Sequence, residues 1–505
     1  MNLKKYLESR QYETVKFVFL KAVHDLFEGC IAEIQNSLNN GSYAEIYHLK
    51  EREIKILSDS EMDSLREKMK EIIKEDIPIK LVTDDVDELK RKAATMKRQD
   101  IKHILENCGW ARLKEYSIGD YVDYFYLNPE SSTGKILDFE IYKYNRGIIF
   151  KTPLEVLDWK IAPYKNTPKI AKAFHERDRW EKVMGINYVG SINEKVFENK
   201  IIEQIMLNET FHDRKIADMA SEILANKKIR VVTIAGPSSS GKTTLSKKME
   251  LQLKTGGVET LAISLDNYYI GRANVPLDEN GEKDFETIEA LDLELLNKNL
   301  EELIKGEETE LPLYDFFTGE RKNEVQKAKL SKDGIIIIEG IHGLNDRLTS
   351  HIPRENKYKI YISCLTQTNM DMHNRIHTTD VRKIRRIVRD SLSRETTGEE
   401  TLMMWNSIRR GEEKWIFPFQ EEADAIFNSS FTYELGVLKP YALKELIKVK
   451  VTSEQYDEAK KLANLLSCFV DIDPSFIPVD SIMKEFIGGS VFYNCLLYTS
   501  PSPRD

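Results

Sequence analysis

The stretch VVTIAGPSSSGKTTLSKKM, residues 231–249, places the strongest constraint on what this chain can fold into. It fits the pattern G-x-x-x-x-G-K-[ST] at Gly236, Gly241, Lys242 and Thr243, with a strand pattern before it and a helix pattern after it. At this loop, successive backbone N–H groups and the start of a helix present positive charge to phosphates. Lys242 bridges the outer phosphates, and Thr243 offers an oxygen to Mg²⁺. A chance Gly-Ser turn is the alternative, and the strand and helix frame weighs against it. The predicted phosphate-binding residues are Gly236, Ser238, Ser239, Ser240, Gly241, Lys242, Thr243 and Thr244.

Short apolar runs alternate with helical patterns from residue 228 onward. The predicted strands are IRVVTIAG, ETLAISL, GIIIIEGI and YKIYISCL. Runs of this kind between helices are typical of a parallel sheet with helices on both faces, so we expect an α/β fold with a P-loop-type sheet. Asp266 and Glu339 end two of these strands, at the edge where the loop lies. Glu339 could therefore orient Mg²⁺, and Asp266 could either accept the proton of an acceptor hydroxyl or cap a turn.

Four arginines share one helical face in DVRKIRRIVRD. Arg382, Arg385, Arg386 and Arg389 stand at offsets 0, 3, 4 and 7. Such a charge run is usually a solvated face. Four arginines in register fit better a mobile, exposed lid helix that closes over ATP and excludes water. We expect Arg385 and Arg386 to act in catalysis and Arg382 and Arg389 to contact the nucleotide.

The motifs favour one class of nucleotide enzyme. The base-reading N-K-x-D motif of GTPases and the L-S-G-G-Q motif of ABC-type ATPases are both missing from the sequence. A small-molecule kinase that uses ATP and Mg²⁺ is therefore the leading hypothesis. The alternative is an ATP-regulated protein that binds tRNA or another RNA. The net charge of −9, from 74 Lys and Arg against 83 Asp and Glu, weighs against that alternative, although tRNA docking stays open.

The composition is that of an ordinary globular protein. A chain of 505 residues is expected to form two or three domains. The five cysteines are scattered singly and the nine histidines show no metal-binding spacing, so we predict neither disulfides nor a structural metal. No apolar run reaches the length of a membrane span and no secretory signal is visible, so we expect a cytoplasmic protein without membrane contact. A homo-oligomer is possible on these grounds.

The first third of the sequence predicts an α+β domain. Helical spacing covers residues 12–29, 59–76 and 86–108, and a strand pattern covers residues 42–49. The runs DYVDYFYL and ILDFEIYKYNRGIIFKT alternate polar and apolar residues and are rich in aromatics, so we expect them to pair in an antiparallel sheet.

Residues 229–441 resemble the uridine kinase and phosphoribulokinase family of P-loop kinases. The likeness runs through GPSSSGKTT, SLDNYY, LPLYDFFTGER, IIIIEGI and TTDVRKIRRIVRD. It implies that Asp266 is the base for a sugar hydroxyl, that Thr243 and Glu339 attend Mg²⁺, and that the arginine segment is the lid. The substrate pocket implied by the resemblance contains Asp266, Tyr269, Glu286, Tyr314, Phe316 and Arg321. Strand packing is the alternative for Tyr314 and Phe316.

One departure from the family concerns specificity. Uridine kinases carry a histidine shortly after YDF that reads the pyrimidine, and Gly319 stands at the corresponding position here. A pocket without that donor loses a means of rejecting other bases. The resemblance therefore implies a nucleoside or related sugar as acceptor without fixing the base.

The N-terminal part has its own likeness. FLKAVHDLFEGCIAEIQNSLNNGSYAEI and GDYVDYFYLNPESSTG resemble the second additional domain of threonyl-tRNA synthetases, an editing hydrolase. The places of its catalytic ligands hold Glu13, Phe17, Phe125 and Pro129. We therefore expect a scaffold without aminoacyl-tRNA hydrolysis. An editing-like domain followed by a uridine-kinase-like domain also resembles a bacterial nucleoside kinase family with this fusion.

The expected domain bounds follow from these patterns. They are an editing-like domain at 1–163, a helical connector at 164–227, a kinase-like domain at 228–445 and a helical appendix at 446–494. The last residues, CLLYTSPSPRD at 495–505, look like the translation of a sequencing adaptor and are expected to be non-native.

Overall fold

The structure of the protein is a computed structural model. It describes residues 3–93, 98–107, 112–277, 281, 283–315 and 318–492. Phe316, predicted to line the substrate pocket, and residues 495–505, predicted to be an adaptor remnant, lie outside the described residues.

The chain folds into two compact units. Unit 1 consists of Met1–Ile201, Thr366–His377 and Lys450–Asp471, and unit 2 consists of Ile202–Leu365, Thr378–Val449 and Ile472–Asp505. Neither the connector expected at 164–227 nor the appendix expected at 446–494 is a compact unit of its own. The predicted appendix is divided between the two units. The backbone N–H of Val470 donates a hydrogen bond to the side chain of Asn193 within unit 1, whereas residues from Ile472 onward belong to unit 2.

Unit 1 combines helices with two antiparallel sheets, whose strand orders are β1-β2-β7-β6 and β3-β4-β5. Its strands are β1 (Cys30–Leu38), β2 (Gly41–His48), β3 (Ile79–Thr83), β4 (Lys114–Ile118), β5 (Tyr121–Phe125), β6 (Glu140–Tyr144) and β7 (Gly147–Lys151). Its helices are α1 (Leu3–Leu26), α2 (Asp59–Lys74), α3 (Val86–Lys92), α4 (Gln99–Asn107), α5 (Pro168–Met184), α6 (Val189–Phe197) and α13 (Tyr456–Ser467).

Two expectations for this region were wrong in detail. The run DYVDYFYL supplies β5, whereas β6 and β7 form a hairpin in the other sheet, so the two runs do not pair with each other. The single helix expected at 86–108 is two helices, α3 and α4. Alternation along a strand reports which face is buried, but it does not say which other strand will be the partner.

The positions compared with the editing ligands are part of the packed interior. Phe17 and Phe125 are fully buried, and their ring centroids lie 4.7 Å apart. Glu13 is paired with Lys16 at 2.5 Å. Apolar packing thus occupies two of the places where the resemblance would put metal or catalytic ligands.

A segment from the second half of the sequence belongs to unit 1. Thr366–His377 follows β13 (Lys357–Ser363) by two residues and leads directly into α10 (Thr378–Ser393). Within unit 1 the side chain of Asn374 donates to the carbonyl of Tyr124 at 2.9 Å and accepts from Lys16 at 2.8 Å. The backbone N–H of Ile34 donates to the carbonyl of Met372 at 2.9 Å.

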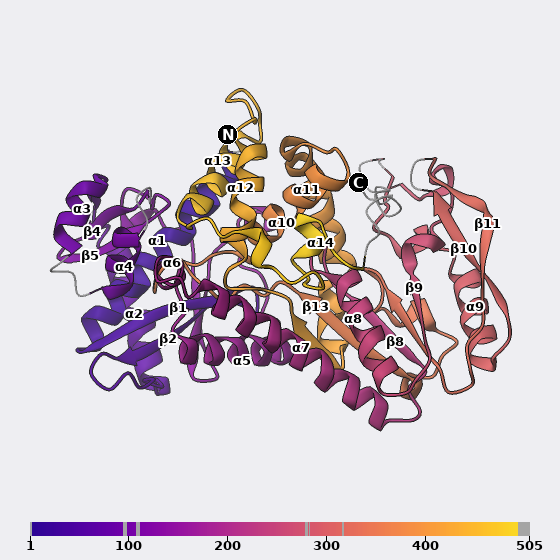
Figure 1. Cartoon of the computed structure of the whole chain (residues 1–505). Coiled ribbons are helices and arrows are strands. Elements are labelled where there is room, and N and C mark those ends of the chain that lie inside the picture. The colour runs from indigo at the N-terminus through magenta and orange to yellow at the C-terminus, as the bar shows by residue number, and fades with distance from the viewer. Residues whose placement is uncertain are drawn as a thin grey trace. The chain divides into compact units, whose positions relative to one another are not determined.

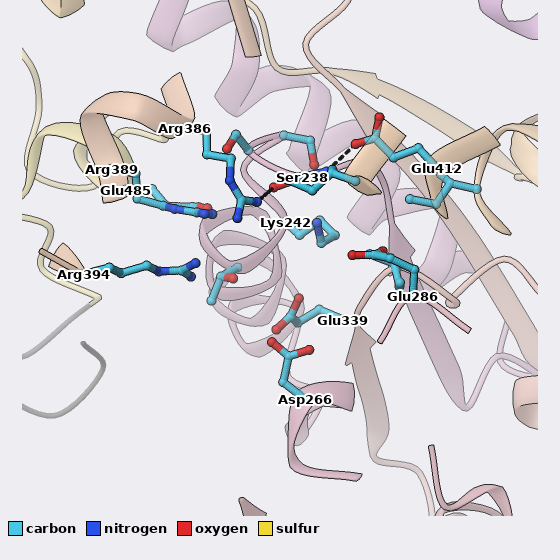
Figure 2. A pocket seen from close by; sticks show the side chains of 16 residues that line it. Ser238, Lys242, Asp266, Glu286, Glu339, Arg386, Arg389, Arg394, Glu412 and Glu485 are labelled. Atoms are coloured by element: carbon cyan, nitrogen blue, oxygen red, sulfur yellow. Dashed lines mark hydrogen bonds between the residues drawn. The ribbon is translucent and has the colours of Figure 1, made fainter. Parts of the chain in front are cut away.

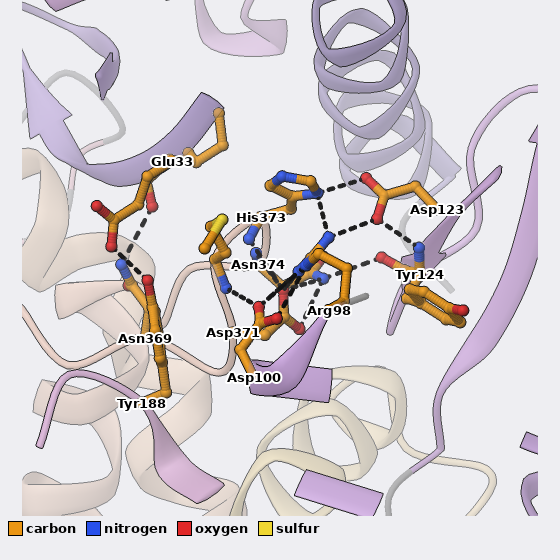
Figure 3. A network of polar contacts seen from close by, with 12 residues as sticks. Glu33, Arg98, Asp100, Asp123, Tyr124, Tyr188, Asn369, Asp371, His373 and Asn374 are labelled. Carbon is orange, nitrogen blue, oxygen red and sulfur yellow. Dashed lines mark hydrogen bonds and ion pairs between the residues drawn. The ribbon is translucent and has the colours of Figure 1, made fainter. Parts of the chain in front are cut away.

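A buried ionic network surrounds the same segment (Figure 3). The Arg98 guanidinium is paired with Asp100 at 2.6 Å, Asp123 at 2.9 Å and Asp371 at 3.1 Å. His373 contacts Asp123 through Nδ1 at 2.6 Å. Burial would raise the pKa of the Asp123 carboxyl, but His373 and Arg98 outweigh it and the pKa is lowered. One cation thus stabilises carboxylates from three parts of the chain.

Unit 2 is built on a five-stranded parallel sheet, which confirms the predicted α/β fold class (Figure 1). Its strand order is β14-β13-β8-β12-β9. The remaining sheet strands are β8 (Val231–Ala235), β9 (Thr260–Ser264), β12 (Ile335–Glu339) and β14 (Ala425–Asn428). A separate antiparallel hairpin is formed by β10 (Thr309–Asp315) and β11 (Glu320–Ala328). The helices are α7 (Ile201–Ala225), α8 (Lys242–Thr255), α9 (Leu293–Lys305), α10, α11 (Gly398–Trp415), α12 (Glu434–Leu446) and α14 (Lys484–Ile487).

The order of the strands sets the site. β12 lies between β8 and β9, and its last residue Glu339 pairs in register with Ser264 of β9 and Ile234 of β8. The Gly-rich loop follows β8, and Asp266 follows β9 in a short 3₁₀ turn. Three predicted elements therefore meet at the carboxyl edge of three adjacent strands, where open α/β sheets bind ligands.

Candidate active site

The Gly-rich loop passes close to its neighbouring strand. A Cβ at Gly236 would collide with the carbonyl oxygen of Ile362 in β13, so glycine is required at that position. Helix α8 begins at Lys242, immediately after the loop. The sequence therefore folds locally into the strand, loop and helix arrangement that the motif predicts.

The donors of the loop have partners within the chain. The Lys242 ammonium donates to the carbonyls of Gly236 at 3.0 Å and Pro237 at 3.1 Å. The backbone N–H of Ser238 donates to Glu412 at 3.1 Å. Lys242 is thus held across the loop, where its charge adds to that of the backbone N–H groups.

A cavity of about 100 Å³ opens beside the loop (Figure 2). Ten of the predicted site residues line it: Ser238, Ser239, Ser240, Lys242, Thr243, Asp266, Glu286, Glu339, Arg386 and Arg389. They come from segments spread over about 150 positions of the sequence, and the parallel sheet brings them together.

Two carboxylates lie on one side of this cavity. Figure 2 shows the carboxylates of Asp266 and Glu339 near each other, below Lys242. The Ser264 hydroxyl donates to Glu339 at 2.8 Å and accepts from the backbone N–H of Asp266 at 3.4 Å. Ser264 thus orients the Glu339 carboxylate and the turn that carries Asp266. Two carboxylates from neighbouring strand ends therefore line the same cavity.

The arginine helix is not the exposed lid that the sequence predicted. Arg382, Arg385 and Arg386 are each 2% exposed or less. Arg385 donates to Glu434 at 2.5 Å and to the carbonyl of Ser429 at 2.7 Å. The reason is that carboxylates of later helices pair with Arg382 and Arg385, and Asp390 of the same helix pairs with Arg386. These pairs offset the cost of burying the charges.

The four arginines divide into two pairs. Arg382 and Arg385 do not line the cavity; Arg382 is paired with Glu412 at 2.9 Å and donates to the carbonyl of Ser238 at 3.0 Å. Arg386 and Arg389 do line it, and Arg386 donates to the hydroxyl of Ser238 at 2.7 Å. The first pair holds the loop, and the second pair presents charge to the cavity.

Asp390 neutralises part of this charge. It forms ion pairs with Arg386 at 3.0 Å and with Arg389 at 2.7 Å, and it accepts a hydrogen bond from Arg389 Nε at 2.8 Å. Burial alone would raise the pKa of the Asp390 carboxyl, but Arg389, Arg386 and Arg394 together outweigh it and lower the pKa. Asp390 therefore stays ionised and keeps the guanidinium groups in place.

Of the predicted substrate residues, Asp266 and Glu286 line the cavity, whereas Tyr269, Tyr314 and Arg321 do not. Tyr269 is buried and donates through its hydroxyl to the carbonyl of Phe285 at 3.0 Å. Tyr314 is buried too, with its ring centroid 6.0 Å from that of Tyr269. Arg321 is paired with Asp292 at 3.0 Å.

Gly319 has a backbone reason for its identity. It lies in the turn between β10 and β11 with φ of +74°, a conformation that side chains rarely adopt. Its carbonyl accepts from the backbone N–H of Arg272 at 2.8 Å. A histidine at this position would strain the turn, so the geometry of the hairpin disfavours the base-reading side chain there.

Sequence reasoning missed three charged residues of the cavity: Arg394, Glu412 and Glu485. None stands in a recognisable motif. Arg394 directly follows α10 and stands four positions after the end of the predicted arginine run at Asp390. The partners of Glu412 and Glu485 are distant along the chain, so no local pattern pointed to them.

The oxygen donors of the cavity suit Mg²⁺. This ion prefers oxygen ligands, keeps several waters and needs only one or two protein ligands beside the phosphates of a nucleotide. The Thr243 hydroxyl and the Glu339 carboxylate both line the cavity. Within the described ranges no three His, Cys, Asp or Glu side chains form a metal-binding group of their own. The fit is therefore to an ion shared with a phosphate chain.

No described helix combines the length and the hydropathy needed to cross a membrane.

Part of this chain is similar to known proteins. Residues 231–435 match the family model described as "Phosphoribulokinase / Uridine kinase family". A uridine kinase of Ligilactobacillus salivarius (strain UCC118) is 30% identical over 198 residues, which cover 39% of this chain and 83% of the relative. A uridine kinase of Halobacterium salinarum is 29% identical over 197 residues, 39% of this chain and 78% of the relative. A solved structure titled as a possible uridine kinase from Bacillus stearothermophilus is 21% identical, covers 42% of this chain and 98% of its own, and has a TM-score of 0.29. Through its kinase region, this chain belongs to the phosphoribulokinase and uridine kinase family.

Proposed function

We propose that the protein transfers the γ-phosphoryl group of ATP, with Mg²⁺, to a hydroxyl of a nucleoside or a related sugar. The observation that carries this proposal is a single cavity lined by Lys242, Thr243, Asp266 and Glu339. A kinase needs phosphate clamps and a proton acceptor within reach of one another. The family assignment supports the same class of reaction.

Each residue has a separate task in the proposed reaction. Lys242 and the loop amides bind the phosphates, and Arg386 and Arg389 offset the charge on the transferred group. Asp266 accepts the proton of the acceptor hydroxyl as that oxygen attacks phosphorus. Thr243 and Glu339 would hold Mg²⁺, which supplies charge neutralisation across the outer phosphates. Arg382 and Arg385 position the loop through their contacts with Ser238, Ser239 and Ser429.

A nucleoside of the uridine or cytidine type is the proposed acceptor, because several relatives of this chain are described as uridine kinases. Gly319 replaces the base-reading histidine expected in that family, so we propose weak discrimination between bases. For residues 1–163 we keep the interpretation of an editing-like scaffold that lacks its catalytic ligands.

An ATP-consumption screen tests the proposal. Purified protein with Mg²⁺ is offered nucleosides and free sugars one at a time, and ADP release and the phosphorylated product are measured. We expect turnover with at least one nucleoside, and a loss of about a hundredfold or more in Lys242→Ala because a phosphate clamp is removed. Lys247→Ala, at a half-buried position of the same helix that does not line the cavity, serves as the control and should retain turnover. Lys242→Ala turnover equal to wild type would refute the assignment.

A further inference from the structure

The carboxylate of Glu485, late in the sequence, is hydrogen-bonded to a predicted phosphate-binding residue, Thr244. Glu485 of α14 accepts two hydrogen bonds from Thr244, one from the hydroxyl at 2.8 Å and one from the backbone N–H at 3.3 Å. Glu485 also lines the cavity beside the loop (Figure 2). A single oxygen, Oε2, therefore takes both donors of Thr244.

The contact lies where an anion is favoured. Thr244 is in the first turn of α8, a helix of 14 residues, and the N–H groups of that turn have no partner within the helix. Such N–H groups carry the positive end of the helix dipole and bind phosphate or carboxylate oxygens. Glu485 thus supplies to Thr244 the kind of oxygen that a phosphate would supply.

The segment that carries Glu485 is firmly docked on unit 2. The side chain of Ile482 approaches Gly241 so closely that a Cβ there would lie 2.6 Å from its Cγ2. The ring of Phe486, 1% exposed, lies 4.9 Å from the Arg385 guanidinium. Asp480 is paired with Lys248 of α8 at 3.0 Å. Residues 480–487 therefore contact both the loop helix and the arginine helix.

We propose that residues 480–487 form an autoinhibitory segment, in which Glu485 closes part of the phosphate site until a nucleotide displaces it. This inference rests on the proposed function, because it assumes that the loop binds a nucleotide. A carboxylate and a phosphate cannot share the two Thr244 donors, since like charges at that separation repel. The measured affinity for ATP is then the affinity of the open loop reduced by the fraction of molecules in which Glu485 has left it.

The direct test is the dissociation constant of ATP with Mg²⁺, measured by calorimetry. Glu485→Gln keeps the size of the side chain and removes the charge, so we expect ATP to bind about tenfold more tightly, a change of about 1.4 kcal/mol. Glu485→Asp keeps the charge and shortens the reach, so an intermediate gain is expected. The control is Asp473→Asn, which makes the same change of net charge on an exposed turn and should leave the affinity unchanged.

Kinetics give a second readout. With a fluorescent ATP analogue, the observed binding rate of the wild type should level off at high concentration, because opening of the segment limits it. In Glu485→Gln the rate should keep rising with concentration. Far-UV circular dichroism under the same conditions checks that each variant is folded.

The outcomes separate the two proposals. If neither wild type nor Glu485→Gln binds ATP, the nucleotide-binding function itself fails. If wild type binds ATP and Glu485→Gln binds it equally or more weakly, autoinhibition is overturned and Glu485 is instead a residue that supports the loop. Tighter binding in Asp473→Asn of the same size would also overturn it, since net charge alone would then explain the gain.

Discussion

Arg386 donates a hydrogen bond of 2.7 Å to the hydroxyl of Ser238, although the two residues are 148 positions apart in the sequence. This contact joins the arginine helix to the phosphate-binding loop. It holds the Arg386 cation beside the loop, so the cost of ordering that side chain is met during folding. The predictions below separate residues that act on the substrate from residues that hold this arrangement.

Asp266→Asn should lower kcat far more than it lowers ATP affinity. The carboxylate is proposed to accept a proton only as the acceptor attacks, which is typically worth about a hundredfold to ten-thousandfold in rate. Steady-state kinetics and direct ATP binding check this together. Equal losses in both would make Asp266 a turn cap whose removal distorts the loop edge.

Arg385→Ala should destabilise unit 2 by about 3–5 kcal/mol, because it leaves the buried carboxylate of Glu434 without its cation. Urea unfolding measures the loss. Arg409→Ala, which removes an exposed ion pair with Glu413 on α11, should cost about 1 kcal/mol or less. Adding Glu434→Gln to Arg385→Ala should recover part of the stability. If Arg385→Ala and Arg409→Ala had equally small effects on stability, the result would favour the original prediction of an exposed lid helix.

Arg98→Met should destabilise unit 1 by about 3–5 kcal/mol, because Asp100, Asp123 and Asp371 would share a buried site without their common cation. Lys70→Met, which removes an exposed pair with Glu67 on α2, is the matched control and should change little. The midpoint of urea unfolding gives both values. A loss in Arg98→Met no larger than in the control would show that water screens this network.

Asp178 predicts a pH dependence. Burial raises the pKa of its carboxyl to about 6, while Lys182 opposes the shift and Glu33 adds to it. A raised carboxyl pKa favours the folded state when the group is protonated, so it costs stability above pH 6 and the cost disappears below about pH 4. Asp178→Asn should therefore be more stable than wild type by about 2–3 kcal/mol at pH 8. This difference in the free energy of unfolding should become smaller as the pH falls through 6. Unfolding midpoints at pH 8 and pH 5 check this, and a gap that widens on acidification would contradict it.

The sequence predicted the centre of unit 2 well because its signals are local. The loop follows its strand directly, and the four predicted strands of the parallel sheet are short apolar runs that need no distant information. The sequence also predicted that Asp266 and Glu339 lie at the same edge of the sheet, because the carboxyl ends of all parallel strands lie at one edge.

What sequence reasoning missed depends on partners that are far apart along the chain. Arg385 looks like a solvated charge until Glu434, 49 positions later, is placed beside it. Glu485 and Thr244 are 241 positions apart, and neither residue belongs to a motif that names the other. The separate sheets of β5 and of the β6-β7 hairpin are likewise a matter of long-range pairing, which alternation within a strand does not encode.

The loop at Thr366–His377 limits how this protein can be dissected. A fragment that begins at residue 228 would contain every cavity residue named above, yet it would also carry Asp371 and His373 away from Arg98. Asp371 and His373 would then lack their partners in unit 1, in the segment that directly precedes α10. A recombinant fragment of unit 2 alone would thus lack the Arg98 network, and a gene rearrangement that separated the two units would lose the same ion pairs.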